Sequence, residues 1–254
     1  MLDHAPAALF VLVSWFLGTA GVLFLDSRPP RTFRAALSVG GLVALLALFG
    51  LGGLADHTSI EAAYLSFGCA MLVWGWHEMA FLMGLVTGPR RAPCPDGARG
   101  WQRFRYAAAT VMHHELALAL TLVLVIVLTS GAPNTVGLET FLVLWVMRLS
   151  AKLNVFLGVR NLAVEFLPEH LRYLESYFTR ARMNPLMPLS IAGAAAALWF
   201  LVDRAAAPDA GTFSVVSTTL VASLLALALL EHVFLALPVP DAVLWRWAHR
   251  SRRS

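Results

Sequence analysis

Charged residues are scarce in this sequence. Asp, Glu, Lys and Arg make up 13% of its 254 residues, whereas 59% are hydrophobic. A water-soluble domain cannot bury so large an apolar share. Lipid offers the backbone no hydrogen-bond partners, so membrane spans must be helices or closed barrels, and the apolar runs here are continuous rather than alternating. The composition therefore predicts an all-α polytopic membrane protein.

Cysteine is almost absent, and so are the short motifs of common enzymes. The two cysteines, Cys69 and Cys94, fall at different predicted depths, one in an apolar run and one in a cytoplasmic loop. A reducing cytoplasm keeps such thiols free, so we expect no structural disulfide. The sequence has no nucleotide-binding glycine loop, nucleophile elbow or HExxH motif, which argues against the enzyme classes that use them.

Seven stretches are long and apolar enough for transmembrane helices, each of which needs about 20 residues. They are predicted at about residues 5–25, 35–55, 60–86, 104–129, 136–160, 186–202 and 213–237. The first stretch lacks the basic start and the cleavage site of a signal peptide, so we expect it to remain as an anchor. Residues 1–254 are therefore predicted to form a single transmembrane helical domain.

Arginine is distributed unevenly among the connections. Clusters lie after the first predicted span, in a loop at about 88–103 and in the tail after residue 245, whereas the intervening connections hold one basic residue, Arg204. The positive-inside rule places the arginine-rich connections in the cytoplasm, with the N-terminus outside and the C-terminus inside. The net charge of +4 then reflects topology and contact with anionic lipid of the bilayer, with no nucleic acid as partner.

The longest stretch without a span is a predicted cytoplasmic loop at about 161–184. After Pro168, the side chains of Leu171, Leu174 and Tyr177 recur at helical spacing, opposite charged residues. This pattern is typical of an amphipathic helix at a membrane interface. A helix that docks on a partner protein would have the same pattern. We therefore predict a helix on the lipid surface, and a partner-binding helix is the alternative.

Ionisable residues occur inside the predicted spans, where each costs several kcal/mol unless it is paired or bound to a ligand. Counting residues from the cytoplasmic end of each helix places three groups at a similar depth. Converging Glu and His side chains are how helical bundles assemble metal sites. We therefore predict as metal ligands, for a possible di-metal centre of iron or manganese, Glu78, His114, Glu115, Glu231 and His232.

A tetrapyrrole is the other cofactor that these residues suit. A neutral imidazole can be the axial ligand of its central metal, and aromatic rings can contact the macrocycle. The candidate cofactor-binding residues are His77, His113, Trp74 and Trp76. Neighbouring residues diverge by about 100° around a helix, so we expect one member of each adjacent pair to face the bundle centre.

Two other interpretations need no cofactor. Arg148 and Lys152, one turn apart in the fifth predicted span, can neutralise the glutamates, which gives a structural network of buried ion pairs. The same groups can form a path for protons or substrate. Further charge or hydrogen-bond partners are predicted along one stripe of that span, where Asn154, Gly158, Asn161 and Glu165 recur at i, i+4, i+7 and i+11.

Three segments of the sequence carry a resemblance. They are HEMAFLMGLVTGPRR at 77–91, RFRY at 103–106 with HELA at 114–117, and KLNVFLGVRNLAVEFLPEHLRYLESY at 152–177. These segments resemble the PuhE family, described as photosynthetic complex assembly proteins of purple and related phototrophic bacteria. The resemblance implies a multi-pass protein of the bacterial cytoplasmic membrane, inner or intracytoplasmic. It also implies reaction-centre subunits or bacteriochlorophyll pathway proteins as partners, and it transfers no catalytic residue.

Three functions are consistent with these observations. The leading hypothesis is a membrane factor that assists assembly of the reaction centre and its pigments, or modulates bacteriochlorophyll production, without turnover. The alternative is a metal-dependent membrane enzyme that acts on a tetrapyrrole, carotenoid or quinone through the His and Glu residues. A transporter, with Arg148 and Lys152 attracting an anionic substrate, is the third, and the lack of an evident inverted repeat counts against it.

Overall fold

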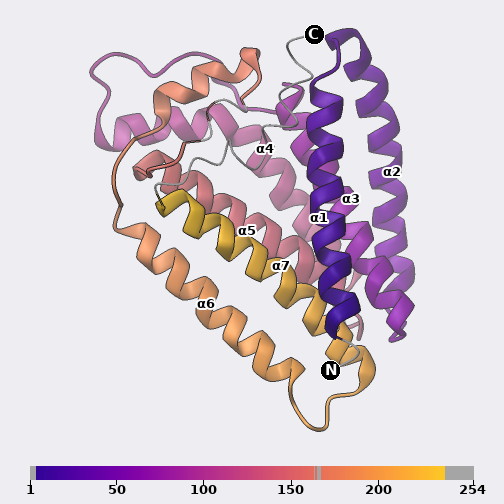
Figure 1. Ribbon diagram of the computed structural model, residues 1–254. Coiled ribbons are helices and arrows are strands. Elements are labelled where there is room, and N and C mark those ends of the chain that lie inside the picture. Colours follow the sequence, from indigo (N-terminus) through magenta and orange to yellow (C-terminus); the bar gives the residue numbers. More distant parts are fainter. Residues whose placement is uncertain (1–3, 163, 165–166, 238–254) are drawn as a thin grey trace.

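The chain is a bundle of long helices in the computed structural model, which describes residues 4–162, 164 and 167–237. Among these residues there is no β-strand, and one isolated backbone bridge joins Val159 to Arg180. Two short 3-10 helices are η1 (Pro30–Thr32) and η3 (Glu169–Tyr177). The α-helices are α1 (His4–Asp26), α2 (Phe33–Leu54), α3 (Ile60–Leu82), α4 (Gly100–Leu128), α5 (Val136–Leu157), α6 (Leu186–Ala205) and α7 (Thr212–Ala236) (Figure 1). The all-helical prediction is confirmed.

Six of the helices in the described part are long and apolar enough to cross a membrane. They are α1, α2 with η1, α4, α5, α6 and α7. The remaining long helix, α3, carries Glu61, His77 and Glu78 among its 23 residues. It packs against α1, α2, α4, α5 and α7, and His77 is buried among them, whereas Leu65 and Leu72 are exposed on its outer side. This central position explains how α3 tolerates polar side chains that a peripheral span could not.

The predicted helix limits agree with the structure within two residues at ten of the fourteen ends and differ by three or four residues at the other four. Helix α4 begins at Gly100, not near residue 104, and α6 ends at Ala205, not near residue 202. Helix α3 ends at Leu82, not near residue 86, and α5 ends at Leu157, not near Arg160. Gly158, with φ 133°, ends α5 because this backbone conformation is open mainly to glycine. The predicted polar stripe is therefore interrupted after Asn154. Asn161 lies beyond the helix, and Glu165 and the predicted cytoplasmic tail lie outside the described residues.

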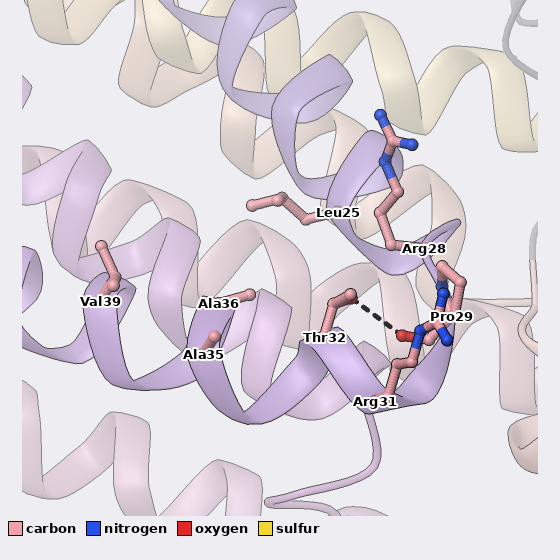
Figure 2. A pocket seen from close by; sticks show the side chains of 8 residues that line it. All are labelled: Leu25, Arg28, Pro29, Arg31, Thr32, Ala35, Ala36 and Val39. Atoms are coloured by element: carbon pink, nitrogen blue, oxygen red, sulfur yellow. Dashed lines mark hydrogen bonds between the residues drawn. The ribbon is translucent and has the colours of Figure 1, made fainter.

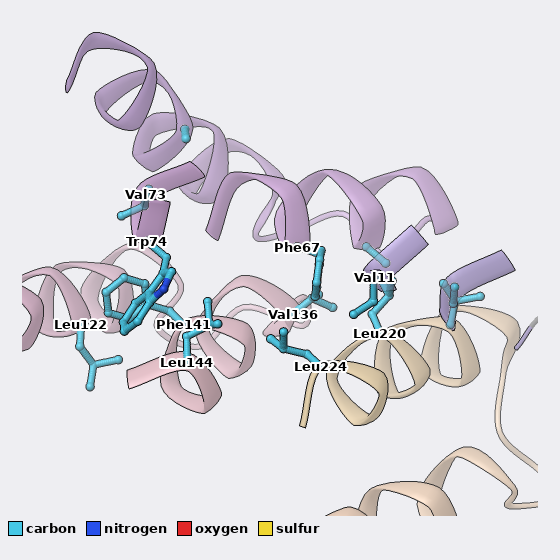
Figure 3. Packing of buried hydrophobic residues seen from close by; sticks show 14 of the residues in the cluster. Val11, Phe67, Val73, Trp74, Leu122, Val136, Phe141, Leu144, Leu220 and Leu224 are labelled. Carbon is cyan, nitrogen blue, oxygen red and sulfur yellow. The ribbon is translucent and has the colours of Figure 1, made fainter. Parts of the chain in front are cut away.

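The core lies where α1, α3, α4, α5 and α7 meet. Phe67, Leu118, Phe141 and Leu220 are fully buried there (Figure 3). The ring of Trp74 meets that of Phe141 edge-on, with centroids 5.8 Å apart. Such packing matters in a membrane because lipid tails are as apolar as the side chains, so apolar contact alone does not drive helices together. Close fit between side chains then holds the helices in place.

The outer surface of the bundle is apolar over the length of the helices. Leu42, Leu46, Leu120 and Val127 are among its exposed side chains. Aromatic residues mark helix ends, with Trp101 exposed at the start of α4 and with Trp199 and Phe200 exposed near the end of α6. An apolar band with aromatic side chains at its edges is the surface expected of a protein in a lipid bilayer.

The arginine-rich connections lie together at one end of the bundle, which we name the basic end (Figure 1). It comprises the α1–α2 connection, the α3–α4 connection (83–99) and the described part of the α5–α6 connection. Arg90 Nε donates a hydrogen bond of 2.7 Å to the Tyr177 hydroxyl, and Arg103 Nη2 donates one of 2.7 Å to Tyr177 O. The predicted orientation, with this end in the cytoplasm, stays a prediction.

The predicted amphipathic α-helix after Pro168 is the 3-10 helix η3, and its apolar side faces protein. Leu171 and Leu174 are buried against Phe81 at the end of α3. Burial raises the pKa of the Tyr173 phenol, while the Thr87 hydroxyl beside it acts in the opposite direction. The apolar residues of η3 thus pack on α3 and α4. The sequence pattern could not distinguish this packing against protein from contact with lipid.

Candidate functional site

Five ionisable side chains from three helices gather toward the basic end of the bundle. We name them the charge cluster, and they comprise Glu78 on α3, His114 and Glu115 on α4, and Arg148 and Lys152 on α5. All five were singled out from the sequence. Their helices hold them because α3 packs against both α4 and α5.

Glu78 lies between a cation of α5 and an imidazole of α4. Arg148 Nη2 donates a hydrogen bond to Glu78 Oε2 at 3.2 Å. His114 Nε2 is 3.6 Å from Glu78 Oε1, which is beyond the range of a good hydrogen bond. Glu78 therefore connects three helices, with one oxygen engaged by Arg148 and the other beside the His114 ring.

Glu115 has partners for both of its carboxylate oxygens. Lys152 Nζ donates to Oε1 at 2.5 Å, and Trp145 Nε1 donates to Oε2 at 3.1 Å. Lys152 is the one lysine of the sequence. Its ammonium also lies 5.7 Å from the centre of the Phe81 ring, so an aromatic face covers part of it. The pair fastens α4 to α5.

The position of His114 depends on the segment that follows α3. His114 N donates to Thr87 O at 2.9 Å, and Arg90 N donates to Ala109 O at 3.2 Å, so the segment runs along α4. A Cβ atom added to Gly88 would overlap the backbone of Ala109 and Thr110. The lack of a side chain at residue 88 is thus what lets the segment reach the α4 backbone.

The His114 ring is fully buried but has few polar contacts. It lies against Phe81 with ring centroids 4.8 Å apart. Neither of its nitrogens makes a hydrogen bond to another described residue, and the same holds for Glu78 Oε1. These atoms are the part of the charge cluster at which a small polar ligand or a metal ion could bind.

Three of the four residues predicted to bind a tetrapyrrole lie near one another. The ring centroids of Trp76 and His77 are 5.1 Å apart, and the rings of Trp74 and His77 both meet that of Phe141. Trp74 is in the core, and Trp76 Nε1 donates a hydrogen bond of 3.1 Å to Leu37 O of α2. His77 Nε2 is 2.9 Å from the Thr121 hydroxyl. His113 is exposed on α4. Tetrapyrrole binding by these four side chains stays a prediction.

His232 belongs to a second polar group, between α5, α6 and α7. Its Nε2 is 3.0 Å from Ser150 Oγ, which donates to Ser190 Oγ at 3.0 Å. Asn154 Nδ2 also donates to Ser190 Oγ at 3.0 Å. Glu231, which directly precedes His232, is exposed and close enough to Arg148 for electrostatic attraction. The adjacent pair therefore divides, with Glu231 turned toward the charge cluster and His232 away from it.

The predicted metal ligands do not form one coordination sphere. In the described part of the chain, no group of three or more His, Cys, Asp or Glu side chains is placed to hold a metal ion. Glu78, His114 and Glu115 lie in the charge cluster, but cations already engage both carboxylates. Metal binding at these residues stays a prediction.

Asn184 is a polar residue whose role the sequence analysis missed. Its Nδ2 donates to Asn154 Oδ1 at 3.1 Å and to Gly158 O at 2.8 Å, and its Oδ1 accepts from Leu186 N and Met187 N. It thereby caps the start of α6 and fastens it to the end of α5. An Asn directly before a Pro at a helix start, as in Asn184-Pro185, is a signal that could have identified it.

Replacing Asn184 by alanine is expected to lower the free energy of unfolding by about 3 kcal/mol, because a helix cap is lost and buried polar groups lose their partners. Reversible unfolding in mixed SDS and dodecyl maltoside micelles measures this change. Asn184→Ser is the matched control, since its hydroxyl keeps an acceptor for the start of α6 but cannot replace the two amide hydrogen bonds to α5, and its stability should fall between those of the wild type and the alanine variant. An alanine variant as stable as the wild type would contradict the assigned hydrogen bonds.

Comparison with known proteins shows the family of this chain. The chain is 41% identical over 245 residues to an "Uncharacterized 30.4 kDa protein in puhA 5'region" of Rhodobacter capsulatus, an alignment that covers 94% of this chain and 89% of the relative. No solved structure matches the chain. The model of one family, described as "Protein of unknown function (DUF3623)", matches residues 1–254. The chain therefore belongs to the DUF3623 family.

Proposed function

We propose that this protein is a multi-pass membrane factor of a phototrophic bacterium that assists assembly of the photosynthetic reaction centre with its pigments, or modulates bacteriochlorophyll production. It acts by binding a partner subunit or pigment inside the bilayer. The Rhodobacter capsulatus relative supports this proposal because it is described as a protein of the puhA 5' region. The resemblance of residues 77–91 and 152–177 to the PuhE family supports the same role.

The observation that carries the proposal is the exposure of Arg148. This residue lies in the middle part of α5, yet 45% of its side chain is accessible from outside the chain. Translocon measurements place the cost of an arginine at the centre of a span at about 2.5–3.5 kcal/mol. Lys152 and Glu115 are also partly accessible, at 23% and 19%. A partly exposed guanidinium at this depth is expected where Arg148 contacts a polar group of a membrane partner.

The ion pairs favour binding over catalysis. Lys152 and Trp145 occupy both oxygens of Glu115, and Arg148 occupies one oxygen of Glu78. A metal ion that used these carboxylates would have to displace cations that already neutralise them. A binding site needs no such displacement, because the exposed side of the Arg148 guanidinium still has donors to offer.

One observation keeps the metal-dependent enzyme as a second candidate. His114 Nε2 and Glu78 Oε1 are 3.6 Å apart, and both are buried without a hydrogen bond. Two ligands bound to one tetrahedral metal ion at about 2.0–2.1 Å lie about 3.4 Å from each other. This candidate would act on a tetrapyrrole, carotenoid or quinone, with His114 and Glu78 as its first two ligands.

Affinity purification from phototrophically grown cells tests the proposal. Tagged wild-type protein should recover reaction-centre subunits or pigment, and Arg148→Gln should reduce that recovery at least about tenfold, the equivalent of about 1.4 kcal/mol. Arg204→Gln is the matched control, because Arg204 is exposed in the last turn of α6, a helix that contributes no residue to the charge cluster. Its recovery should equal that of the wild type.

Two outcomes would contradict the proposed role. Equal recovery by Arg148→Gln and the wild type, with both folded to the same thermal midpoint, would remove Arg148 from any partner site. Stoichiometric iron or manganese in the purified protein, lost in His114→Ala together with pigment production, would instead favour the metal-dependent enzyme. Elemental analysis and the absorption spectrum of the same preparations distinguish these results.

A further inference from the structure

A groove opens at the basic end, where α1 passes into α2. It has a volume of about 600 Å³, and residues of both helices and of η1 line it (Figure 2). It is remote from the charge cluster in the sequence, and the proposed function makes no use of it. Its mouth is polar and its wall is apolar, so it is suited to an amphipathic molecule.

Two arginines supply the charge at the mouth of the groove. Arg28 and Arg31 are both exposed, and no acidic side chain is among the lining residues. The Arg28 guanidinium lies 4.0 Å from the centre of the Phe24 ring, which holds it against the end of α1. Arginine donors in a planar fork bind phosphate in a bidentate manner, so this mouth favours a phosphate group.

The turn that presents the arginines is stiff. Pro29 and Pro30 fix the backbone between the two arginines, and the Thr32 hydroxyl donates a hydrogen bond of 2.9 Å to Pro29 O. On the α1 side, the Ser27 hydroxyl donates one of 2.7 Å to Phe24 O. A stiff turn reduces the entropy lost when a ligand binds, which increases the affinity of the site.

The wall of the groove continues along the membrane-crossing surface of α2. It is formed by Ala36 and Val39, with Leu25 of α1 opposite. Val39 and Leu25 are exposed large apolar side chains, whereas Ala36 is small and leaves space between the helices. Behind this wall, Trp76 Nε1 binds Leu37 O and so fixes α2 to α3. The apolar part of a ligand would therefore lie along a rigid surface in the bilayer.

We infer that this groove binds an anionic phospholipid, with its phosphate between Arg28 and Arg31 and an acyl chain along Ala36 and Val39. A polar mouth at a helix end, continued by an apolar wall on a span, matches the two parts of a lipid molecule. Basic residues near a membrane surface each contribute about 1 kcal/mol to the attraction of anionic lipid. The apolar wall adds a contact that free phosphate or a soluble acidic peptide does not use.

Native mass spectrometry of the delipidated full-length protein tests this inference with defined lipids. Phosphatidylglycerol should give a bound adduct at concentrations at least tenfold lower than phosphatidylcholine. The double change Arg28→Gln with Arg31→Gln should weaken phosphatidylglycerol binding about tenfold. Arg99→Gln with Arg172→Gln removes the same charge from exposed positions elsewhere at the basic end, and it should leave binding within about twofold of the wild type.

A second variant tests the apolar wall without changing charge. Ala36→Leu fills the space between the helices, and it should weaken phosphatidylglycerol binding at least fivefold while the arginines remain. Equal loss in both double variants would show attraction by net charge alone and overturn the site. Displacement of the lipid by inorganic phosphate at the same concentration would overturn the lipid assignment, and so would full binding by the Ala36→Leu protein.

Discussion

Replacing Lys152 by methionine is expected to lower the free energy of unfolding by about 3–5 kcal/mol, because it leaves the Glu115 carboxylate without its cation at membrane depth. Methionine keeps most of the apolar stem of the side chain but has no ammonium, so the ion pair with Glu115 and the cation–π contact with Phe81 are both lost. Glu115 retains its hydrogen bond from Trp145, which cannot neutralise it. Unfolding in mixed SDS and dodecyl maltoside micelles gives the measurement.

A double-mutant cycle separates the ion pair from the fit of the side chains. Glu115→Gln removes the negative charge but keeps an oxygen that can accept from Trp145. The double variant with Lys152→Met should therefore be about 2 kcal/mol more stable than the sum of the single changes predicts. Leu149→Met, a neutral change at an exposed position of α5, is the control and should have little effect. Strictly additive losses would show that Lys152 and Glu115 are not coupled.

Helix positions could be predicted well because each apolar run is bounded by recognisable residues. Helix α3 begins at Ile60, as predicted, where the Ser59 hydroxyl caps the helix by accepting from Ala62 N at 3.2 Å. Helix α5 begins at Val136, directly after the polar segment that follows α4. A change from polar to continuous apolar sequence is a local signal, and for spans of this length it is sufficient to indicate a helix.

The end of α5 could not be predicted because contacts far away in the sequence determine it. The apolar pattern continues through Val159, but Gly158 ends the helix and Val159 instead forms backbone hydrogen bonds with Thr179 and Ala181. Asn184 secures this arrangement by donating to Gly158 O. A glycine inside a helical pattern permits such an end without requiring it, so the sequence alone did not indicate where the helix stops.

The charge cluster could be predicted in part. Depth along the helices placed the His and Glu groups of three spans at one level and left Arg148 and Lys152 as cations that could neutralise the glutamates, and the structure shows which carboxylate each cation engages. The spacing of residues does not give the rotation of each helix about its own axis. This rotation places His114 inside the bundle and its neighbour His113 outside, because adjacent residues diverge by about 100°.

Gly88→Ala is expected to be the other change with a large effect, lowering the free energy of unfolding by about 3 kcal/mol. The added methyl group would overlap Ala109 O and the backbone of Thr110, and backbone atoms of a helix cannot move aside as a side chain can. Relief of the overlap would separate Thr87 O from His114 N, so the imidazole beside Glu78 would shift as well.

The matched control for this change is Gly53→Ala in α2. A Cβ atom at Gly53 meets nothing within 4 Å, and alanine favours a helix over glycine by about 1 kcal/mol, so this variant should be as stable as the wild type or slightly more stable. The same micelle titration measures both variants, and the NMR signals of the imidazole report the environment of His114. A Gly88→Ala protein with wild-type stability and an unshifted His114 would show that the 87–90 segment does not rest on α4, and the charge cluster would then need another explanation for the position of its histidine.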